Sequence, residues 1–137
     1  MLISDLSIIV RGSYIYSSRN LAEYEITAAE EFILMYILGH EESNQDAIAK
    51  YFMLDKGSVA RSLAKLESKG FISRKINDEN QREKVIRLTP KAHKIRDVMA
   101  ELLIEWTETM YDGLTKDEIS NFETTAQKVA ENITKVI

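Results

Sequence analysis

Apolar residues recur at helical spacing along most of the chain, and this pattern predicts a mostly α-helical protein. The first predicted helix covers residues 2–20. A second is expected to begin after Thr27 and to end at Gly39, because Thr27 and Glu30 have the spacing of a capping box. In such a box the hydroxyl and the carboxylate each accept a hydrogen bond from a backbone N–H at the start of the helix.

Two shorter helices joined by a tight bend are predicted next. The first of them begins near Ser43 or Asn44, and Asp55 caps the second. Gly70 provides the left-handed backbone conformation that commonly ends a helix. The apolar residues of the second helix recur at i, i+4 and i+7, which predicts one inward-facing stripe of Val59, Leu63 and Leu66.

From Phe71 the pattern changes to an alternation of apolar and basic residues, which is the period of a β-strand. Two such segments, FISRKI and KVIRLT, flank a polar, turn-rich stretch and predict a two-stranded hairpin. Two helices joined by a tight bend and followed by a basic hairpin make a winged helix-turn-helix, whose second helix enters the major groove of DNA. The predicted fold class is therefore mostly α with a small β-hairpin wing.

Two further helices are predicted after the hairpin. Pro90 opens the first, at a position where a missing backbone N–H costs nothing, and this helix ends near Gly113. Thr115 and Glu118 form a second capping box that begins the last helix. The apolar residues of this last helix repeat at intervals of three and four, the spacing of a helix that packs along another helix: Ile119, Phe122, Ala126, Val129, Ile133 and Val136. Together with the apolar first helix, the repeat predicts dimerisation, since a lone winged unit could not bury both.

The length of 137 residues and the lack of a Gly/Ser linker predict a single domain, residues 1–137. Within it we expect a winged helix-turn-helix DNA-binding lobe over residues 27–94. The flanking residues, 1–26 and 95–137, are expected to form a helical dimerisation region. The N-terminus carries no basic leader, and no apolar run approaches the length of about 18 residues that a membrane span needs. A cytoplasmic protein without membrane contact is therefore expected.

The positive charge of the chain is concentrated in one segment. Residues 56–96 contain twelve Lys and Arg residues and four acidic ones, a net charge of +8, whereas the remainder carries six against eighteen, a net charge of −12. An acidic body with one basic segment suggests that a polyanion binds to that segment. A solvated, charge-rich surface without a partner is the alternative interpretation of the charge alone.

Residue types for enzymatic chemistry are scarce. The chain has no cysteine, which excludes disulfides, thiolate metal sites and cysteine redox switches, and it shows no Gly-rich phosphate loop or catalytic triad. It has two histidines, His40 and His93, and the stretch GHEE around His40 is interpreted as a surface turn rather than a metal site. No enzyme activity, cofactor or metal site is therefore expected.

DNA contacts are expected from the fourth helix and the hairpin. Arg61 is long and forked enough for a bidentate contact with guanine, close to the small Gly57, whose alternative role is to relax the first turn of the helix. Arg82, in the predicted tip of the hairpin, is the candidate for a minor-groove contact. Each basic residue taken alone could instead contact a phosphate or remain solvated. The full set of candidates is Lys56, Gly57, Ser58, Arg61, Lys65, Arg74, Lys75, Arg82 and Lys84.

Three segments carry a resemblance to a known family: ITAAEEFILMYIL, NQDAIAKYFMLDKGSVARSLAKLESKGFISRK and NDENQREKVIRLTPKA. They are similar to the MarR (multiple antibiotic resistance regulator) family of transcription regulators. The resemblance implies a homodimer whose first and last two helices interlock, with two winged lobes that read a pseudo-palindromic operator in double-stranded DNA. Asn80 departs from the Asp that the family has two residues before the wing Arg, here Arg82, and Ala92 replaces a common Gly.

Many members of that family are repressors that small aromatic anions release, and the resemblance implies a ligand pocket between the dimer helices and the DNA-binding lobe. The candidate lining residues are Arg11, Tyr14, Met35, Tyr36 and Trp106, although aromatic and Met residues at helical spacing are more often core. The favoured function is a sequence-specific DNA-binding transcriptional regulator, a homodimeric repressor of nearby genes. A winged-helix protein-interaction module without sequence-specific DNA binding is the alternative, and the concentrated positive charge speaks against it.

Overall fold

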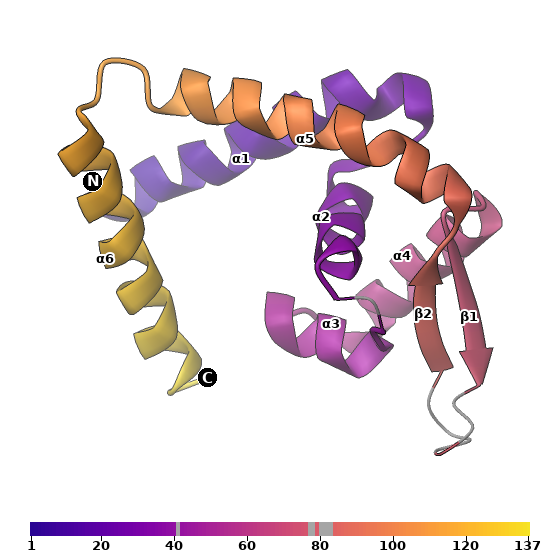
Figure 1. Cartoon of the computed structure of the whole chain (residues 1–137). Helices are drawn as coiled ribbons and strands as arrows, with labels where there is room; N and C mark the ends of the chain where they lie inside the picture. Colours follow the sequence, from indigo (N-terminus) through magenta and orange to yellow (C-terminus); the bar gives the residue numbers. More distant parts are fainter. Residues whose placement is uncertain (41, 77–78, 80–83) are drawn as a thin grey trace. The chain divides into compact units, whose positions relative to one another are not determined.

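The computed structural model describes residues 1–40, 42–76, 79 and 84–137, and it confirms a mostly helical chain with one antiparallel hairpin (Figure 1). The chain divides into two compact units, Met1–Leu102 and Leu103–Ile137. The elements in chain order are α1 (Leu2–Leu21), the 3-10 turn η1 (Ala22–Tyr24), α2 (Ala28–Leu38), α3 (Gln45–Phe52), α4 (Lys56–Ser68), β1 (Ile72–Ile76), β2 (Lys84–Leu88), α5 (Pro90–Met110) and α6 (Lys116–Thr134). Among the described residues, no helix combines the length and the apolar character needed to cross a membrane.

The first unit has a hydrophobic core to which α2, α3, α4, the hairpin and the first turns of α5 all contribute. The predicted inward stripe of α4 is confirmed, because Val59, Leu63 and Leu66 are all 0% exposed. The carboxylate of Glu31 on α2 is also buried, and it accepts a hydrogen bond from the Ser17 side chain. Its Oε2 atom has no hydrogen-bond partner in the described part of the chain, and burial raises the pKa of Glu31 above its ordinary value.

Side-chain caps begin the helices of the helix-turn-helix as the sequence predicts. Asn44 accepts a hydrogen bond from the Ala47 backbone N–H at 2.8 Å, and Asp55 Oδ1 accepts one from the Ser58 N–H at 2.8 Å. Gly70 follows α4 with φ of +81°, the left-handed conformation expected there. These caps fix where α3 and α4 start, and hence the bend between them.

The capping box predicted at the start of α2 is only half formed. The Thr27 hydroxyl accepts from the Glu30 N–H at 3.2 Å, but the Glu30 carboxylate accepts from the Thr27 hydroxyl and from Lys69 instead of from a backbone N–H. Lys69 Nζ lies 2.9 Å from both Glu30 carboxylate oxygens and 2.6 Å from the Glu25 carbonyl oxygen. The Lys69 ammonium therefore joins the end of α4 to the start of α2, around a Glu30 side chain that is only 2% exposed.

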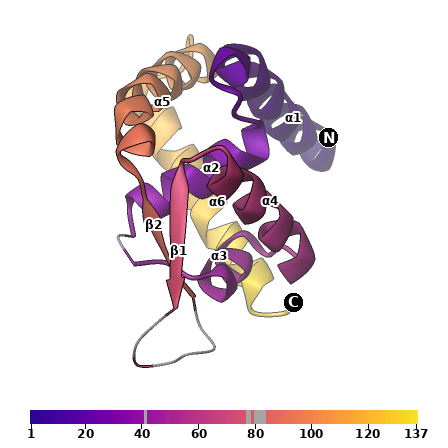
Figure 2. The same cartoon turned by 90° about the vertical axis from the view of Figure 1, so that its right-hand side faces the viewer.

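The hairpin pairs β1 with β2 in an antiparallel register that places Ile72 opposite Leu88 and Arg74 opposite Ile86 (Figure 2). A further bridge that the sequence did not indicate joins Ile86 to Ser43, with the Ile86 N–H donating to the Ser43 carbonyl at 2.7 Å. β2 is thus paired on both sides at Ile86, which is 1% exposed. The hairpin is consequently tied to the segment that leads into α3.

The second unit contains the end of α5 and all of α6. The capping box of Thr115 and Glu118 is confirmed in both of its hydrogen bonds. Near the turn at Gly113, the Tyr111 hydroxyl donates to Glu123 Oε1 at 2.8 Å. The predicted apolar stripe of α6 is uncovered in the single chain, with Phe122, Val129, Ile133 and Val136 between 44% and 81% exposed.

Candidate nucleic-acid interface

The N-terminal turn of α4 carries a connected set of polar side chains. Asp55 Oδ2 accepts a hydrogen bond from the Ser58 hydroxyl at 2.6 Å, and Ser58 Oγ accepts one from Arg61 Nη2 at 3.2 Å. The hydrogen bonds from the Ser58 hydroxyl and backbone lower the pKa of Asp55, and the positive charge of Arg61 lowers it further. Asp55 is therefore an ionised acceptor at neutral pH, and Ser58 links it to the Arg61 guanidinium.

The two lysines among the predicted α4 contacts, Lys56 and Lys65, are both exposed. Lys56 Nζ lies 3.4 Å from Asp46 Oδ1 on α3, and both side chains are more than 70% exposed, so water and salt weaken this ion pair. The carbonyl oxygen of Lys56 also accepts a hydrogen bond from the Gln45 side chain at 3.2 Å. Both ammonium groups can consequently reach an incoming anion at little cost.

The wing candidates fall into two groups. Arg74 is only 20% exposed, and its guanidinium forms a bidentate pair with Glu67 on α4, with Nε 3.2 Å from Oε2 and Nη2 3.1 Å from Oε1. The hydrogen bond from Arg74 lowers the pKa of Glu67. Lys75 and Lys84 are exposed, whereas Arg82 and Asn80 lie outside the described residues. The structure thus places Arg74 as a link between β1 and α4, and leaves Lys75 and Lys84 available to solvent.

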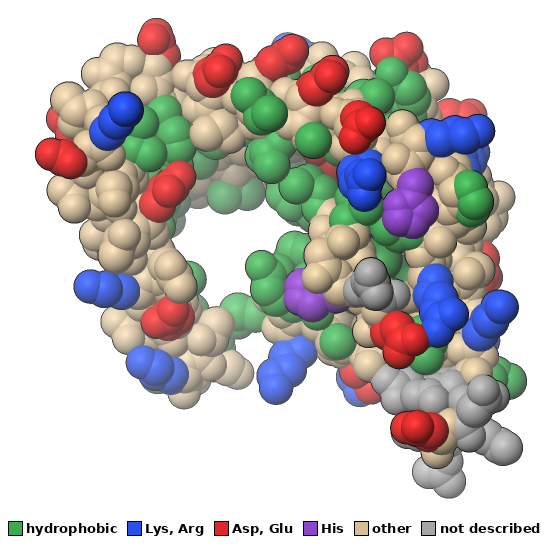
Figure 3. Space-filling view, in the orientation of Figure 1, with side chains coloured by type: hydrophobic (Ala, Val, Ile, Leu, Met, Phe, Trp, Pro, Cys, Tyr) green, Lys and Arg blue, Asp and Glu red, His purple; other side chains and the backbone are tan. Residues whose placement is uncertain are grey.

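Lys and Arg side chains gather over the hairpin and the beginning of α5 on the face drawn in Figure 3. Arg87 on β2 is one of the basic residues of the hairpin, and its Nη2 lies 2.6 Å from Glu42 Oε1. The partners Glu67 and Glu42 were not among the residues predicted from the sequence. Neither could be found from spacing along the chain, because each pairs with an Arg on a different element.

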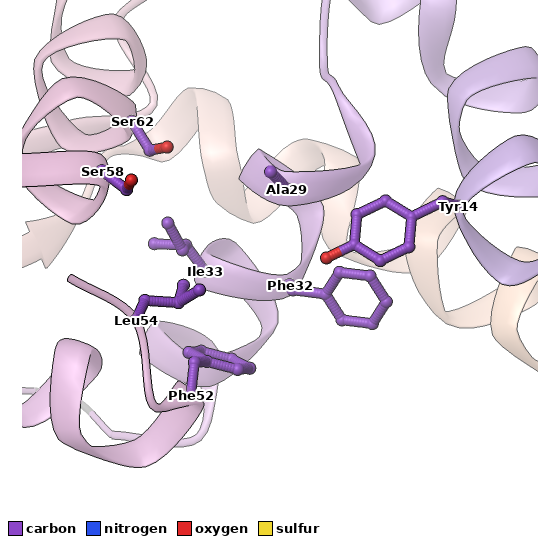
Figure 4. A pocket seen from close by; sticks show the side chains of 8 residues that line it. All are labelled: Tyr14, Ala29, Phe32, Ile33, Phe52, Leu54, Ser58 and Ser62. Carbon is purple, nitrogen blue, oxygen red and sulfur yellow. The ribbon is translucent and has the colours of Figure 1, made fainter. Parts of the chain in front are cut away.

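A cavity of about 340 Å³ lies between α1, α2, the turn after α3 and the start of α4 (Figure 4). The Tyr14 and Phe32 rings stand beside one another at one end, with their centroids 5.3 Å apart. Ser58 and Ser62 of α4 face the other end. The described lining consists of Tyr14, Ala29, Phe32, Ile33, Phe52, Leu54, Ser58 and Ser62.

The described lining of the cavity in Figure 4 includes one of the five residues predicted for a ligand pocket. Tyr14 alone among them lines the cavity of Figure 4, and Tyr36 instead stacks on His40, with 4.0 Å between ring centroids. Arg11 is exposed on α1, Met35 is half-buried on α2, and Trp106 belongs to the second unit. The apolar wall is completed by Phe32, Phe52 and Leu54, which were not predicted from the sequence, because α2 meets the end of α3 and the turn after it there.

The surroundings of His40 are those of a helix end. Its Nδ1 atom lies 2.7 Å from the Tyr36 carbonyl oxygen, one turn earlier in α2. Within the ranges that the structure describes, no group of three or more His, Asp or Glu side chains is arranged to hold a metal ion.

Comparisons with known proteins agree with this architecture. The model of the MarR family matches residues 26–84. The chain is 23% identical over 132 residues to the uncharacterized HTH-type transcriptional regulator YybA of Bacillus subtilis, covering 96% of this chain and 88% of that protein. A crystal structure of MarR is 30% identical, with a TM-score of 0.88 over 98% of this chain and 92% of that one. A MarR-family structure from Listeria monocytogenes, complexed with a 26mer DNA, is 22% identical, with a TM-score of 0.93 over 97% of this chain and 89% of that one. The protein described above therefore belongs to the MarR family of transcriptional regulators.

Proposed function

We propose that this protein is a homodimeric, sequence-specific DNA-binding regulator that represses nearby genes. The observation that carries the proposal is the N-terminal turn of α4, where Ser58 and Arg61 point polar groups out of a helix whose other face is fully buried. The basic segment around this turn and the acidic remainder of the chain favour a polyanion at this surface. The similar Listeria monocytogenes structure, which is complexed with DNA, also supports DNA as the partner of this surface.

DNA binding is tested by fluorescence anisotropy with fragments of the gene's own upstream region and with shuffled fragments of equal length. We expect one fragment to be preferred, and the affinity to fall steeply with salt because Lys and Arg displace counterions from phosphates. Arg61→Ala should cost about 1–3 kcal/mol on the preferred fragment and less on shuffled DNA. Lys65→Ala is the matched control and should weaken both equally, as loss of a phosphate contact does. Equal binding of all fragments, or affinity indifferent to salt, contradicts the proposal.

Repression is tested separately, with a reporter gene placed behind the preferred fragment. Deletion of the regulator should raise reporter expression, since the bound protein would no longer occlude the promoter. A fall in expression would instead identify an activator. Either result leaves the binding measurement untouched.

Dimerisation is supported by apolar side chains that each unit exposes to solvent. On α1, Ile8 and Val10 are 69% and 55% exposed, and on α6 the stripe around Val129 is uncovered. A second copy of the chain would bury these surfaces at a gain of roughly 25 cal/mol per Å². Sedimentation at micromolar concentration should show a dimer that Val129→Glu breaks and that Thr124→Glu, on the opposite side of α6, leaves intact. A wild-type monomer refutes this part.

A small aromatic ligand that releases DNA is the last part of the proposal, and it rests on the cavity of Figure 4. Its lining joins the Tyr14 and Phe32 rings to Ser58 on α4, so an occupant would press on the helix that faces DNA. The described lining residues include no Lys or Arg, which favours a neutral aromatic molecule over an anion. Phenol should therefore weaken DNA binding more than benzoate does, and Phe32→Ala should abolish the effect while Tyr36→Phe preserves it. Unchanged DNA affinity with both compounds contradicts the ligand part.

A further inference from the structure

We propose that Asp55 and Ser58 position the Arg61 guanidinium across Gly57, so that Arg61 meets a base edge in one fixed orientation. This inference rests on the proposed function, because it concerns how α4 distinguishes one DNA sequence from another. Asp55 and Ser58 are positioning residues here, and Arg61 is the group they position. Gly57 provides the space in which the arrangement fits.

The direction of each hydrogen bond in the relay is fixed by chemistry. A hydroxyl has a single proton, and Ser58 donates it to Asp55 Oδ2 at 2.6 Å. Asp55 accepts only, since hydrogen bonding lowers the pKa of its carboxyl group. The Ser58 oxygen is therefore left as an acceptor, and it takes a hydrogen bond from Arg61 Nη2 at 3.2 Å. Asp55 thus acts on Arg61 through Ser58 and keeps Ser58 from donating outward.

Gly57 is explained by the space around it and not by its backbone. A Cβ atom at this position would lie 3.2 Å from Arg61 Nη1 and 3.2 Å from Asp55 Oδ1, tighter than nine in ten real Cβ contacts, so these neighbours would have to shift by a few tenths of an ångström. Its φ lies outside the left-handed range that favours glycine, so relaxation of a strained turn is not needed. The residue is small because the guanidinium and the carboxylate both approach it.

Among the described residues, this arrangement leaves most of the guanidinium donors of Arg61 without a partner. Arg61 has five N–H groups, and the Ser58 contact uses one on Nη2, so a forked pair can still face the two acceptors of a guanine edge. A long side chain that is already oriented loses less rotamer freedom on binding. The expected consequence is discrimination between bases rather than general affinity, because contacts to base edges specify the sequence whereas contacts to phosphates do not.

The decisive variant is Gly57→Ala, which improves helix propensity and displaces the guanidinium at once. We expect little change in thermal stability, because the gain in helix propensity offsets the crowding of the Asp55 cap, together with a fall of at least about fivefold in the ratio of Kd values for shuffled and preferred fragments. Ser58→Ala should lower the ratio similarly, and Ser58→Thr should restore it because the hydroxyl returns. Ser68→Ala, at the exposed end of the same helix, is the matched control. Adding Gly57→Ala to Arg61→Ala should cause no further loss.

Two results would overturn the inference, and they differ from each other. If the wild-type protein prefers one fragment but Gly57→Ala and Ser58→Ala keep the wild-type ratio, the positioning role is wrong while the proposed function stands. If the wild-type protein prefers no fragment, the proposed function and the positioning role are both wrong. A measurement without DNA tests the positioning role even if the variants bind DNA poorly. The Arg61 Nε–Hε signal in ¹H–¹⁵N spectra can be assigned by its loss in Arg61→Ala. This signal should shift in Ser58→Ala and remain unchanged in Ser68→Ala.

Discussion

Replacement of Lys69 by Met removes one charge and keeps the length of the side chain. The Lys69 ammonium has three protons and three acceptors within hydrogen-bond distance, namely both Glu30 carboxylate oxygens and the Glu25 carbonyl oxygen. After the substitution, the only described hydrogen bond left to the Glu30 carboxylate is the one from the Thr27 hydroxyl. The perturbation therefore leaves a buried carboxylate without a counter-charge.

The size of the effect follows from burial. Removing one partner of a buried ion pair costs about 3–5 kcal/mol, and the Glu30 side chain is 2% exposed. Lys69 is itself 26% exposed, so water can reach the space it leaves, and we expect a loss near the lower limit, about 3 kcal/mol. Glu30→Gln in the same protein removes the unpaired charge and should recover roughly 1–2 kcal/mol of the loss.

Urea unfolding followed by circular dichroism measures these differences, at one fixed protein concentration because dimerisation would shift the midpoint. Lys65→Met is the matched control, since Lys65 is exposed on the same helix, and it should change the free energy of unfolding by less than about 0.5 kcal/mol. A Lys69→Met protein as stable as Lys65→Met would refute the reasoning. So would a double variant with Glu30→Gln that is no more stable than Lys69→Met alone.

Three further changes test other parts of the fold by the same unfolding measurement. Burial raises the pKa of Glu31, so the folded state holds the carboxyl proton more tightly than the unfolded state does. The free energy of unfolding should therefore fall as the pH rises above 4.5, the ordinary pKa of a glutamate. Glu31→Gln should flatten that fall, and an unchanged pH profile in this variant would contradict the explanation. Gly70→Ala should cost about 1–2 kcal/mol because φ is +81°, whereas Gly39→Ala, at φ of −87°, should be close to neutral. Thr115→Ala should cost about 1 kcal/mol by removing the cap of α6, and no loss would mean that the cap contributes nothing.

The order and the limits of the elements could be predicted because the signals that set them are local. The caps at Asn44, Asp55 and Thr115, the stop at Gly70 and the start at Pro90 all act within a few residues of the chain. The inward stripe of α4 follows from the helical period alone. These features needed no knowledge of which elements meet.

Features that depend on contacts between elements were missed. The Glu30 carboxylate leaves its expected capping role because Lys69, thirty-nine residues later, supplies a charged and therefore stronger partner. Arg74 pairs with Glu67 because β1 runs back along α4. The cavity wall of Phe32, Phe52 and Leu54 exists only once two separate segments converge. In each case the spacing along the sequence carries no sign of the contact.

The hairpin is anchored to the core near one end and is exposed to solvent at the other. Ile72 and Ile86 are 2% and 1% exposed, and both the N–H and the carbonyl of Ile86 are hydrogen-bonded to Ser43, whereas Ile76 at the other end of β1 is 62% exposed. Ser43, which forms the β-bridge with Ile86, directly precedes Asn44, the residue that caps α3. A displacement of β2 is therefore transmitted through Ser43 to the start of the helix-turn-helix. We therefore expect the wing and the two helices to move together, and the Ile86 amide to exchange its hydrogen more slowly than the amides of β1 beyond Arg74.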